Sequence, residues 1–225
     1  MRKHPLALSL ILALTLVLFC SPARAAGQLT VTESNLLTIP GSGTGLFCAA
    51  VENTGDAPIA VGQGKLAVFT DAGELLLVQD YLSATPTGLL LAPGEGTYLT
   101  AYLWDEQLGA LTAPLTCTVS VRTNDWSQAA DVLTATSVLD VDAGTVDVTF
   151  TNPSDTILSG LLLNVALRDA EGALLGVCST SLDRVGLHPG STLTVTVPLD
   201  WNLTEALRTA GVTISSAEAQ VLSLR

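Results

Sequence analysis

Three cysteines and one histidine are the best candidates for covalent chemistry after residue 25: Cys48, Cys117, Cys178 and His188. A cysteine nucleophile needs a base within hydrogen-bond reach to take its proton. His188 lies in Leu187-His-Pro-Gly190, a pattern typical of a turn. Its spacing from Cys178 gives no reason to expect a catalytic dyad. We therefore expect no catalytic residue among these four.

Carboxylates gather in Asp140-Val-Asp142-Ala-Gly-Thr-Val-Asp147, where they hint at a calcium loop. An EF-hand loop needs an oxygen ligand at its fifth position and a glutamate at its twelfth, where this chain has Gly144 and Thr151. The same stretch matches the acid-free loop Ile39–Gly45 of the first half. A strand-connecting turn is the better interpretation, and we expect no metal site and no cofactor.

Two kinds of sugar chemistry are open to the chain. Trp104, Trp126 and Trp201 would form a stacking platform if they were exposed. However, Trp104 and Trp201 stand in equivalent Leu-Trp-Asp and Leu-Asp-Trp stretches just after strands, which favours burial in the core or between domains. A glycosidase would need two paired carboxylates, and the acids are scattered over turns and strand ends. Hydrolysis of glycans is therefore the weaker alternative.

The cysteines fall on different faces of the expected strands. The stretch around Cys117 is similar to the nucleophile strand of sortases, but the sortase histidine precedes its cysteine, and no histidine lies between Ala26 and Leu187. Alternation with apolar neighbours predicts that Cys117 points inward, whereas Cys48 and Cys178 point outward. A Cys48–Cys117 disulfide is therefore disfavoured. A Cys48–Cys178 or intermolecular disulfide stays open beside the simpler case of free thiols.

The residues above are set in a chain that repeats one pattern twice. The repeated segments are Asn53-Thr-Gly-Asp56, Asp71-Ala-Gly73 and Pro93-Gly94, followed by Asn152-Pro-Ser-Asp155, Asp169-Ala-Glu-Gly172 and Pro189-Gly190. The shared positions are turn formers and core residues rather than nucleophiles or metal ligands. Overlaying the copies also predicts one inward apolar row in each, made of Phe47, Ala49 and Val51 and of Val146, Val148 and Phe150. The repeat therefore predicts a scaffold used twice.

Short runs rich in Val, Leu and Thr alternate with turn residues, which is the rhythm of an all-β sandwich. We predict two tandem immunoglobulin-like β-sandwich domains at 26–123 and 131–225, joined by a short linker at 124–130 that allows either a fixed or a hinged pair. The first domain is expected to have strands near Leu29–Glu33, Leu46–Glu52, Leu66–Thr70, Leu75–Gln79, Gly96–Leu103 and Leu115–Arg122. The second is expected to have strands near Val132–Val138, Val146–Thr151, Leu162–Arg168, Leu174–Cys178, Thr192–Val197 and Val212–Leu222. One helical turn is expected from Trp201 to Gly211, capped by Asn202.

Residues 1–25 have the form of a secretory signal peptide, with cleavage expected after Ala25. Its apolar run, Leu6–Cys20, is shorter than a membrane-spanning helix needs, so no integral membrane segment is expected in the mature chain. The full chain has 21 acidic and 9 basic residues, a formal net charge of −12. Such a charge repels phosphate backbones, so nucleic acid is not an expected partner. The mature protein is expected to be secreted or associated with the cell envelope.

A strand that ends in Val-x-Asn, an Asp-to-Gly hairpin and a Leu-x-Pro-Gly turn recur in both halves. The second copy has Val148–Asn152, Asp169 with Gly172, and Leu187–Gly190. This pattern resembles bacterial export-linked immunoglobulin-like modules of the FxLYD kind, although neither copy has the Phe and Tyr of the naming motif. The resemblance implies a non-enzymatic surface or secreted module, and it assigns no catalytic, cofactor-binding or metal-binding residue.

The sequence therefore predicts an exported, non-enzymatic binding, adhesion or structural protein. A protein or cell-envelope partner would be bound by an edge strand or by loops, because few charges protect the strands. A carbohydrate-binding accessory protein is the first alternative, and a secreted glycan hydrolase is the second. Exposure of the tryptophans and clustering of the carboxylates separate these classes.

Overall fold

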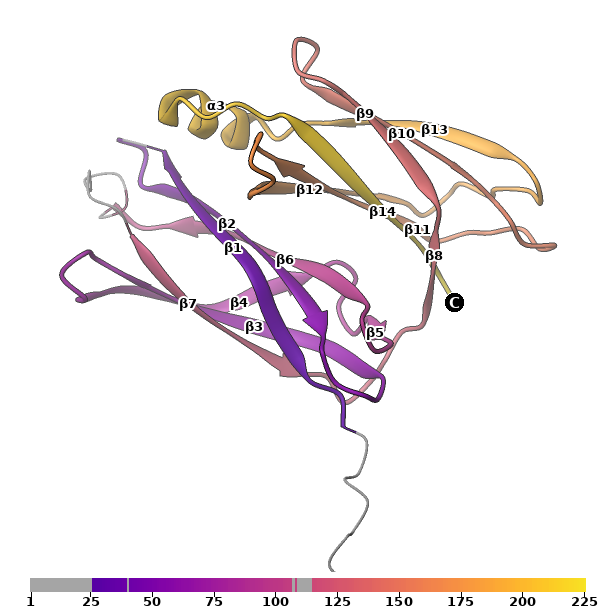
Figure 1. The fold of residues 1–225 in the computed structure, drawn as a ribbon, viewed down its shortest axis with the longest axis horizontal. Helices are drawn as coiled ribbons and strands as arrows, with labels where there is room; N and C mark the ends of the chain where they lie inside the picture. Colours follow the sequence, from indigo (N-terminus) through magenta and orange to yellow (C-terminus); the bar gives the residue numbers. More distant parts are fainter. Residues whose placement is uncertain (1–25, 40, 107, 109–114) are drawn as a thin grey trace, which may run out of the picture.

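Residues 26–39, 41–106, 108 and 115–225 are described by a computed structural model, and they form stacked antiparallel sheets with one labelled helix (Figure 1). The expected all-β fold is confirmed. The expected signal peptide, 1–25, lies outside the described residues. Within the described part of the chain, no helix has the length and apolarity needed to cross a membrane.

The N-terminal unit consists of two layers of strands. Its strands are β1 (Leu29–Ile39), β2 (Thr44–Asn53), β3 (Ile59–Phe69), β4 (Leu75–Ala84), β5 (Leu90–Leu91), β6 (Gly96–Trp104) and β7 (Thr116–Thr123). One layer has the order β1-β2-β6, and the other has the order β4-β3-β7 with β5 beside the start of β3. The end of β4 pairs with β6 at Ser83 and Ala84, which joins the two layers into one sheet.

The C-terminal unit repeats this strand order. Its elements are β8 (Ala130–Leu133), β9 (Ala135–Asp140), β10 (Thr145–Thr151), β11 (Leu161–Arg168), β12 (Leu174–Leu182), β13 (Thr192–Pro198), α3 (Trp201–Ala210) and β14 (Ser216–Leu224). The layer β9-β10-β13 corresponds to β1-β2-β6, and β12-β11-β14 corresponds to β4-β3-β7, with β8 added at the edge. The duplication in the sequence is therefore also a duplication of topology.

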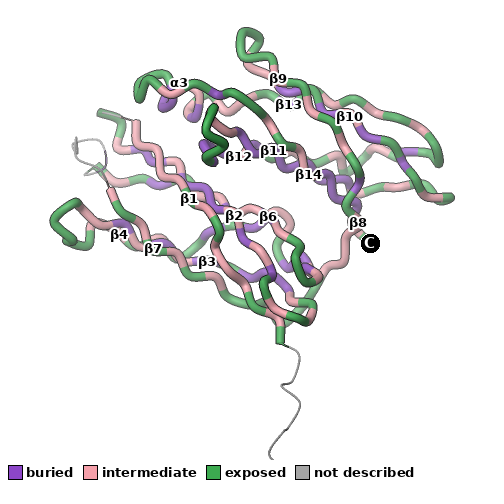
Figure 2. Tube along the Cα trace, in the orientation of Figure 1, coloured by how far each residue is buried: buried purple, intermediate pink, exposed green. Residues whose placement is uncertain are grey.

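The two units pack face to face, so the molecule has four layers in the order β4-β3-β7, β1-β2-β6, β12-β11-β14-β8 and β9-β10-β13 (Figure 1). This packing explains why β11 is buried along almost its whole length, as Figure 2 shows in purple. Leu163 and Val165 enter the core of their own unit. Leu162 on the opposite face joins the hydrophobic cluster of the N-terminal unit. Apolar residues on both faces of one strand are typical of a strand covered on both sides.

Polar side chains fix the relative position of the units. The amide of Asn35 in β1 donates to the carbonyl of Leu175 in β12 at 2.9 Å. Arg168 in β11 donates to the Glu33 carboxylate at 2.7 Å and is only 14% exposed. Asn164 donates to a backbone carbonyl of the N-terminal unit at 2.9 Å. The sequence left a fixed and a hinged pair open, and these contacts describe a packed pair.

The duplicated asparagines, Asn53 and Asn152, make equivalent hydrogen bonds in the two units. Asn53 is fully buried and donates to the carbonyls of Ala57 at 2.9 Å and Leu91 at 3.0 Å. Asn152 is also fully buried and makes the two equivalent bonds at 2.8 Å. A buried amide without hydrogen-bond partners would destabilise the fold. The bonds of each asparagine satisfy its amide and also connect the turn after β2 or β10 to the segment just before the Pro-Gly turn. The predicted structural role of the Asn-x-x-Asp turn is confirmed, and the six residues of the inward core row are all buried.

Local details differ from the sequence predictions. The single strand predicted at Val132–Val138 is divided between β8 and β9, which belong to different sheets. In the β11–β12 hairpin, the carboxylate of Asp169 accepts a hydrogen bond from the backbone N–H four residues later. In the β3–β4 hairpin, the hydroxyl of Thr70 accepts the equivalent bond. The counterpart of Asp169 is therefore Thr70 and not Asp71. The predicted helix is present, but Asp200 caps it and not Asn202, whereas Gly211 closes it at φ 70° as expected. Several strands are also longer than predicted, because β-bulges let pairing continue past a break in the apolar alternation.

Candidate functional site

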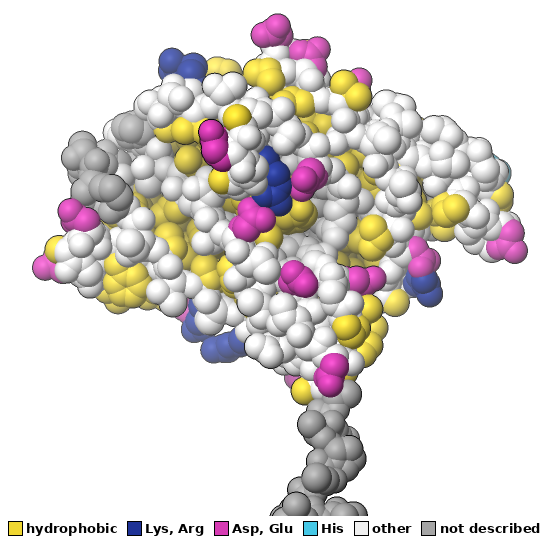
Figure 3. Space-filling model, viewed as in Figure 1, with side chains coloured by type: hydrophobic (Ala, Val, Ile, Leu, Met, Phe, Trp, Pro, Cys, Tyr) yellow, Lys and Arg dark blue, Asp and Glu magenta, His cyan; other side chains and the backbone are white. Residues whose placement is uncertain are grey.

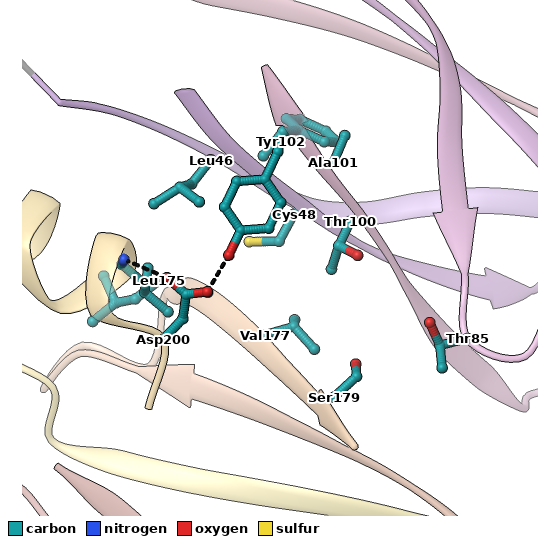
Figure 4. A pocket seen from close by; sticks show the side chains of 13 residues that line it. Leu46, Cys48, Thr85, Thr100, Ala101, Tyr102, Leu175, Val177, Ser179 and Asp200 are labelled. Atoms are coloured by element: carbon teal, nitrogen blue, oxygen red, sulfur yellow. Dashed lines mark hydrogen bonds between the residues drawn. The ribbon is translucent and has the colours of Figure 1, made fainter. Parts of the chain in front are cut away.

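A cavity of about 240 Å³ lies between the two units, next to the start of α3 (Figure 4). Both units line it, through β2 and β6 on one side and β12 and the start of α3 on the other. Its lining residues are Leu46, Phe47, Cys48, Thr85, Thr100, Ala101, Tyr102, Leu175, Gly176, Val177, Ser179, Asp200 and Leu203. Because the wall is part apolar and part hydroxyl-bearing, the cavity suits a small polar molecule with apolar faces.

Gly176 in β12 lets α3 approach the cavity closely. A Cβ atom added to Gly176 would lie 2.5 Å from the side chain of Leu203, so any other residue would require that side chain to move. Leu203 is one of the buried residues that hold α3 against the sheet. Gly176 therefore leaves room for the Leu203 side chain at the start of α3, next to the Asp200 cap.

Tyr102 and Asp200 meet across the boundary between the units (Figure 4). The hydroxyl of Tyr102 donates to Oδ2 of Asp200, and Oδ1 of Asp200 accepts from the backbone N–H of Leu203 at 3.0 Å. Burial and the neighbouring carboxylate raise the pKa of Tyr102 to about 12. The phenol therefore stays protonated at neutral pH and acts as a hydrogen-bond donor. The pair holds a carboxylate in a fixed orientation at the edge of the cavity.

Two exposed tryptophans adjoin this pair, one through a ring contact and one through the chain. Trp104 stacks beside Tyr102 with ring centroids 6.4 Å apart and planes 16° apart, and Trp201 directly follows Asp200 in the chain. Trp104 is 74% exposed and Trp201 is 77% exposed. The prediction that both would be buried was wrong, because β6 ends at Trp104 and because α3 turns Leu203 and its neighbours, not Trp201, toward the core. We call Tyr102, Trp104 and Trp201 the aromatic site.

Trp126 belongs to a different part of the surface. It follows β7, is 54% exposed, and packs its ring over Gly88, where an added Cβ would lie 2.6 Å from the ring. It lines a separate shallow pocket with Arg122 and Asn124. The three tryptophans therefore do not form one row, and Trp126 provides a natural control for the other two.

The three described cysteines are all free thiols. Cys48 points out of its own unit, as predicted, into the interface between the units, where burial raises the pKa of its thiol to about 12. Cys117 points inward, as predicted, and burial raises its pKa to about 11. Cys178 was predicted to face outward, and this was wrong: it pairs with Val165 and lies in the core of the C-terminal unit. Within the chain, neither the Cys48–Cys117 nor the Cys48–Cys178 disulfide forms.

The other candidate residues have structural positions. His188 is exposed in its turn, where its carbonyl accepts from the N–H of Ser191 at 3.0 Å, whereas Cys178 is buried, and no contact joins the two. Oδ1 of Asp140 accepts from the N–H of Ala143 at 2.9 Å, so the acidic stretch forms a strand-connecting turn as interpreted. Over residues 26–39, 41–106, 108 and 115–225, no three metal-ligating side chains gather. Figure 3 shows carboxylates scattered over the visible face.

Sequence reasoning singled out neither Tyr102 nor Asp200. The sequence signal nearest to them is the matched position of Leu-Trp-Asp at the end of β6 and Leu-Asp-Trp just after β13. What the sequence does not contain is the face-to-face packing that brings the two stretches together.

The chain matches no protein-family model, and no curated protein matches it. Its function is therefore inferred from the geometry of the site itself.

Proposed function

We propose that this chain is an exported, non-enzymatic binding module whose ligand lies on the aromatic site and extends into the cavity between the units. The observation that carries the proposal is the exposure of Trp104, which stacks on Tyr102, and of Trp201, which directly follows Asp200, next to the fixed Tyr102–Asp200 pair. Large aromatic rings exposed beside a concave polar wall are costly to leave in water and are common at binding sites. A ligand that covers these rings removes their apolar area from water, which favours binding.

The ligand class that fits this chemistry best is a neutral carbohydrate. Sugar rings present C–H faces that stack on aromatic rings, and hydroxyl groups that bind carboxylate and hydroxyl oxygens. Asp200 keeps free lone pairs beyond its two accepted bonds, and Thr100 and Ser179 line the wall behind it. The net charge of −12 disfavours sulfated or uronic-acid glycans. A cavity of about 240 Å³ takes the end of a chain rather than a long segment.

Hydrolysis of the ligand is disfavoured by the groups at the site. A glycosidase uses two carboxylates on either side of the scissile bond, and Asp200 is the single carboxylate among the residues that line the cavity. The thiol of Cys48 stays protonated at neutral pH, because burial raises its pKa to about 12. Binding without turnover is the simpler function for such a wall.

The two units are proposed to be immunoglobulin-like modules of the FxLYD kind. The shared order of strands and the matched Asn53 and Asn152 turns support this assignment. Export is supported by a contact at the expected mature N-terminus: the backbone nitrogen of Ala26 donates to Oδ1 of Asp56 at 2.6 Å. Cleavage after Ala25 would turn this bond into a pair between an α-ammonium group and a carboxylate, which strengthens it.

A glycan array probed with labelled mature protein tests the binding function. We expect capture by neutral glycans, with the signal lost in Trp104→Ala and Trp201→Ala and kept in Trp126→Ala. Mass spectrometry of the recovered glycans is expected to find them intact. Capture that is equal in all three variants would contradict the proposed site, and shortened glycans would favour the hydrolase instead.

Export is tested by expressing the full chain in a secreting bacterial host and sequencing the N-terminus of the protein in the medium or envelope fraction. The expected first residue is Ala26. An uncleaved protein retained in the cytoplasm would contradict the export proposal while leaving the binding proposal untouched.

A further inference from the structure

The same apolar trio recurs on equivalent strands of the two units. In the C-terminal unit Ala166 pairs with Val177, and Leu174 stands at the start of β12. In the N-terminal unit Ala67 pairs with Val78 in the same way, and Leu75 stands at the start of β4. The matched hairpin bonds of Thr70 and Asp169 put the two strand pairs in the same register. The trios are therefore equivalent: Ala166, Val177 and Leu174 in one unit, and Ala67, Val78 and Leu75 in the other.

The two trios differ in what covers them. In the C-terminal unit Ala166 and Leu174 are buried in a cluster with Cys48 of the neighbouring unit, and Val177 packs against it. In the N-terminal unit no described element lies over the trio, and Val78 is 53% exposed and Leu75 is 58% exposed. Figure 3 shows hydrophobic side chains at the surface near the β3–β4 hairpin. The outer face of β12-β11-β14 is therefore an interface between the units, whereas the equivalent face of β4-β3-β7 is open.

The open face does not carry the negative charge of the rest of the chain. Its outward positions on β3 and β4 include Lys65 and Asp80, which form an ion pair at 2.5 Å. Its outward positions on β7 are Thr116, Thr118, Ser120 and Arg122, none of which is acidic. A molecule with a net charge of −12 repels its own copies wherever carboxylates face each other. On this face that repulsion is absent, and a two-fold axis can place Lys65 of each copy near Asp80 of the other.

We propose that the outer face of β4-β3-β7 is a self-association surface, on which two copies of the chain pack by a two-fold axis with trio against trio. A two-fold interface needs a self-complementary patch, and an apolar centre with a Lys–Asp pair beside it meets that need. The other outer face of the molecule, β9-β10-β13, is a poorer candidate for self-association. In it, Asp147 and Thr149 stand where the interface residues Cys48 and Ala50 stand in β2, so it is a polar outer face.

Sedimentation equilibrium of the mature protein tests this proposal, and the chain offers a matched control. Val78→Lys places a charge within the trio of the open face, whereas Val138→Lys places the same charge on β9, where Val138 is 67% exposed on the polar outer face. The wild type is expected to reach the mass of a dimer. Val78→Lys is expected to raise the dissociation constant by about 100-fold, because the lysine would have to be desolvated in the interface. Val138→Lys is expected to dimerise like the wild type.

Circular dichroism and thermal unfolding establish that both variants are folded, and Leu75→Ser provides a second change in the same face should Val78→Lys unfold. A wild type that stays monomeric up to its solubility limit would overturn the proposal. Equal loss of dimer in Val138→Lys would overturn it as well, because the contact would then not be specific to the trio. Neither result bears on ligand binding at the aromatic site.

Discussion

Tyr102 donates a hydrogen bond to Asp200 across the boundary between the two units, and this bond unites their separate surfaces into one site. Tyr102 comes from the end of β6, and Asp200 is the residue that caps α3. Neither unit alone has the site, because Trp104 belongs to one and Trp201 to the other. The duplication therefore supplies two scaffolds, and the contact between them supplies the function that we propose.

Tyr102→Phe is expected to change the alkaline stability of the protein. The folded state raises the pKa of Tyr102 from 10.0 to about 12, so folding favours the protonated phenol. Its contribution to stability is complete below pH 10.0 and is lost as the pH rises through about 12. Urea unfolding at a series of pH values is expected to give a steeper alkaline loss for the wild type than for the variant. Equal losses would mean that the tyrosine is not held in this environment.

Asn53→Ala and Asn152→Ala are expected to destabilise the protein by similar amounts. Each change leaves two backbone carbonyls, one of them buried, without their amide donor, which costs about 1–3 kcal/mol in the free energy of unfolding. Asn124→Ala serves as the control, because the side chain of Asn124 makes no hydrogen bond with the described residues. Chemical denaturation measures all three. A small effect at one asparagine and a large effect at the other would contradict their equivalence.

The thiols are expected to be free but unreactive in the native protein. Cys48 and Cys178 are buried, and burial raises the pKa of both thiols, so the reactive thiolate is scarce. A thiol reagent is expected to label neither quickly under native conditions, and to label three cysteines per mature chain in denaturant without a reductant. Fewer than three labelled thiols in denaturant would reveal a disulfide. Cys117, which is only half-buried, is expected to react first.

The sequence predicted the interior of each unit well, because a repeat tests each position twice. The inward row around Ala49 and Val148, the roles of Asn53 and Asn152 and the facing of Cys48 all follow from alternation and turn chemistry. Cys178 was placed wrongly although its counterpart, Gln79, was identified correctly. Gln79 pairs with the buried Leu66 and so faces inward, but it lies on an edge strand where a polar side chain still reaches water. A polar residue at the rim of a sandwich does not mark the outer face.

The candidate site was less predictable, since it depends on contacts between the units. Trp104 and Trp201 were expected to be buried because of their places near the ends of core strands, yet both are exposed, Trp104 as the last residue of β6 and Trp201 as the first residue of α3. The cap of α3 was assigned to Asn202 because a glutamate follows it three residues later. In the structure Glu205 instead pairs with Arg208, and Asp200 takes the cap. Local patterns of this kind carry no information about which two sheet faces pack together.

The most direct test of the account is a nuclear magnetic resonance titration of the three tryptophan indole N–H signals, assigned with single Trp→Phe variants. The mature protein is titrated with soluble neutral oligosaccharides of the cello-, xylo-, manno- and chito- series. The account predicts that at least one series shifts the signals of Trp104 and Trp201 together in a saturable way and leaves Trp126 unchanged. No shift with any series, or a shift confined to Trp126, would contradict carbohydrate binding at the aromatic site.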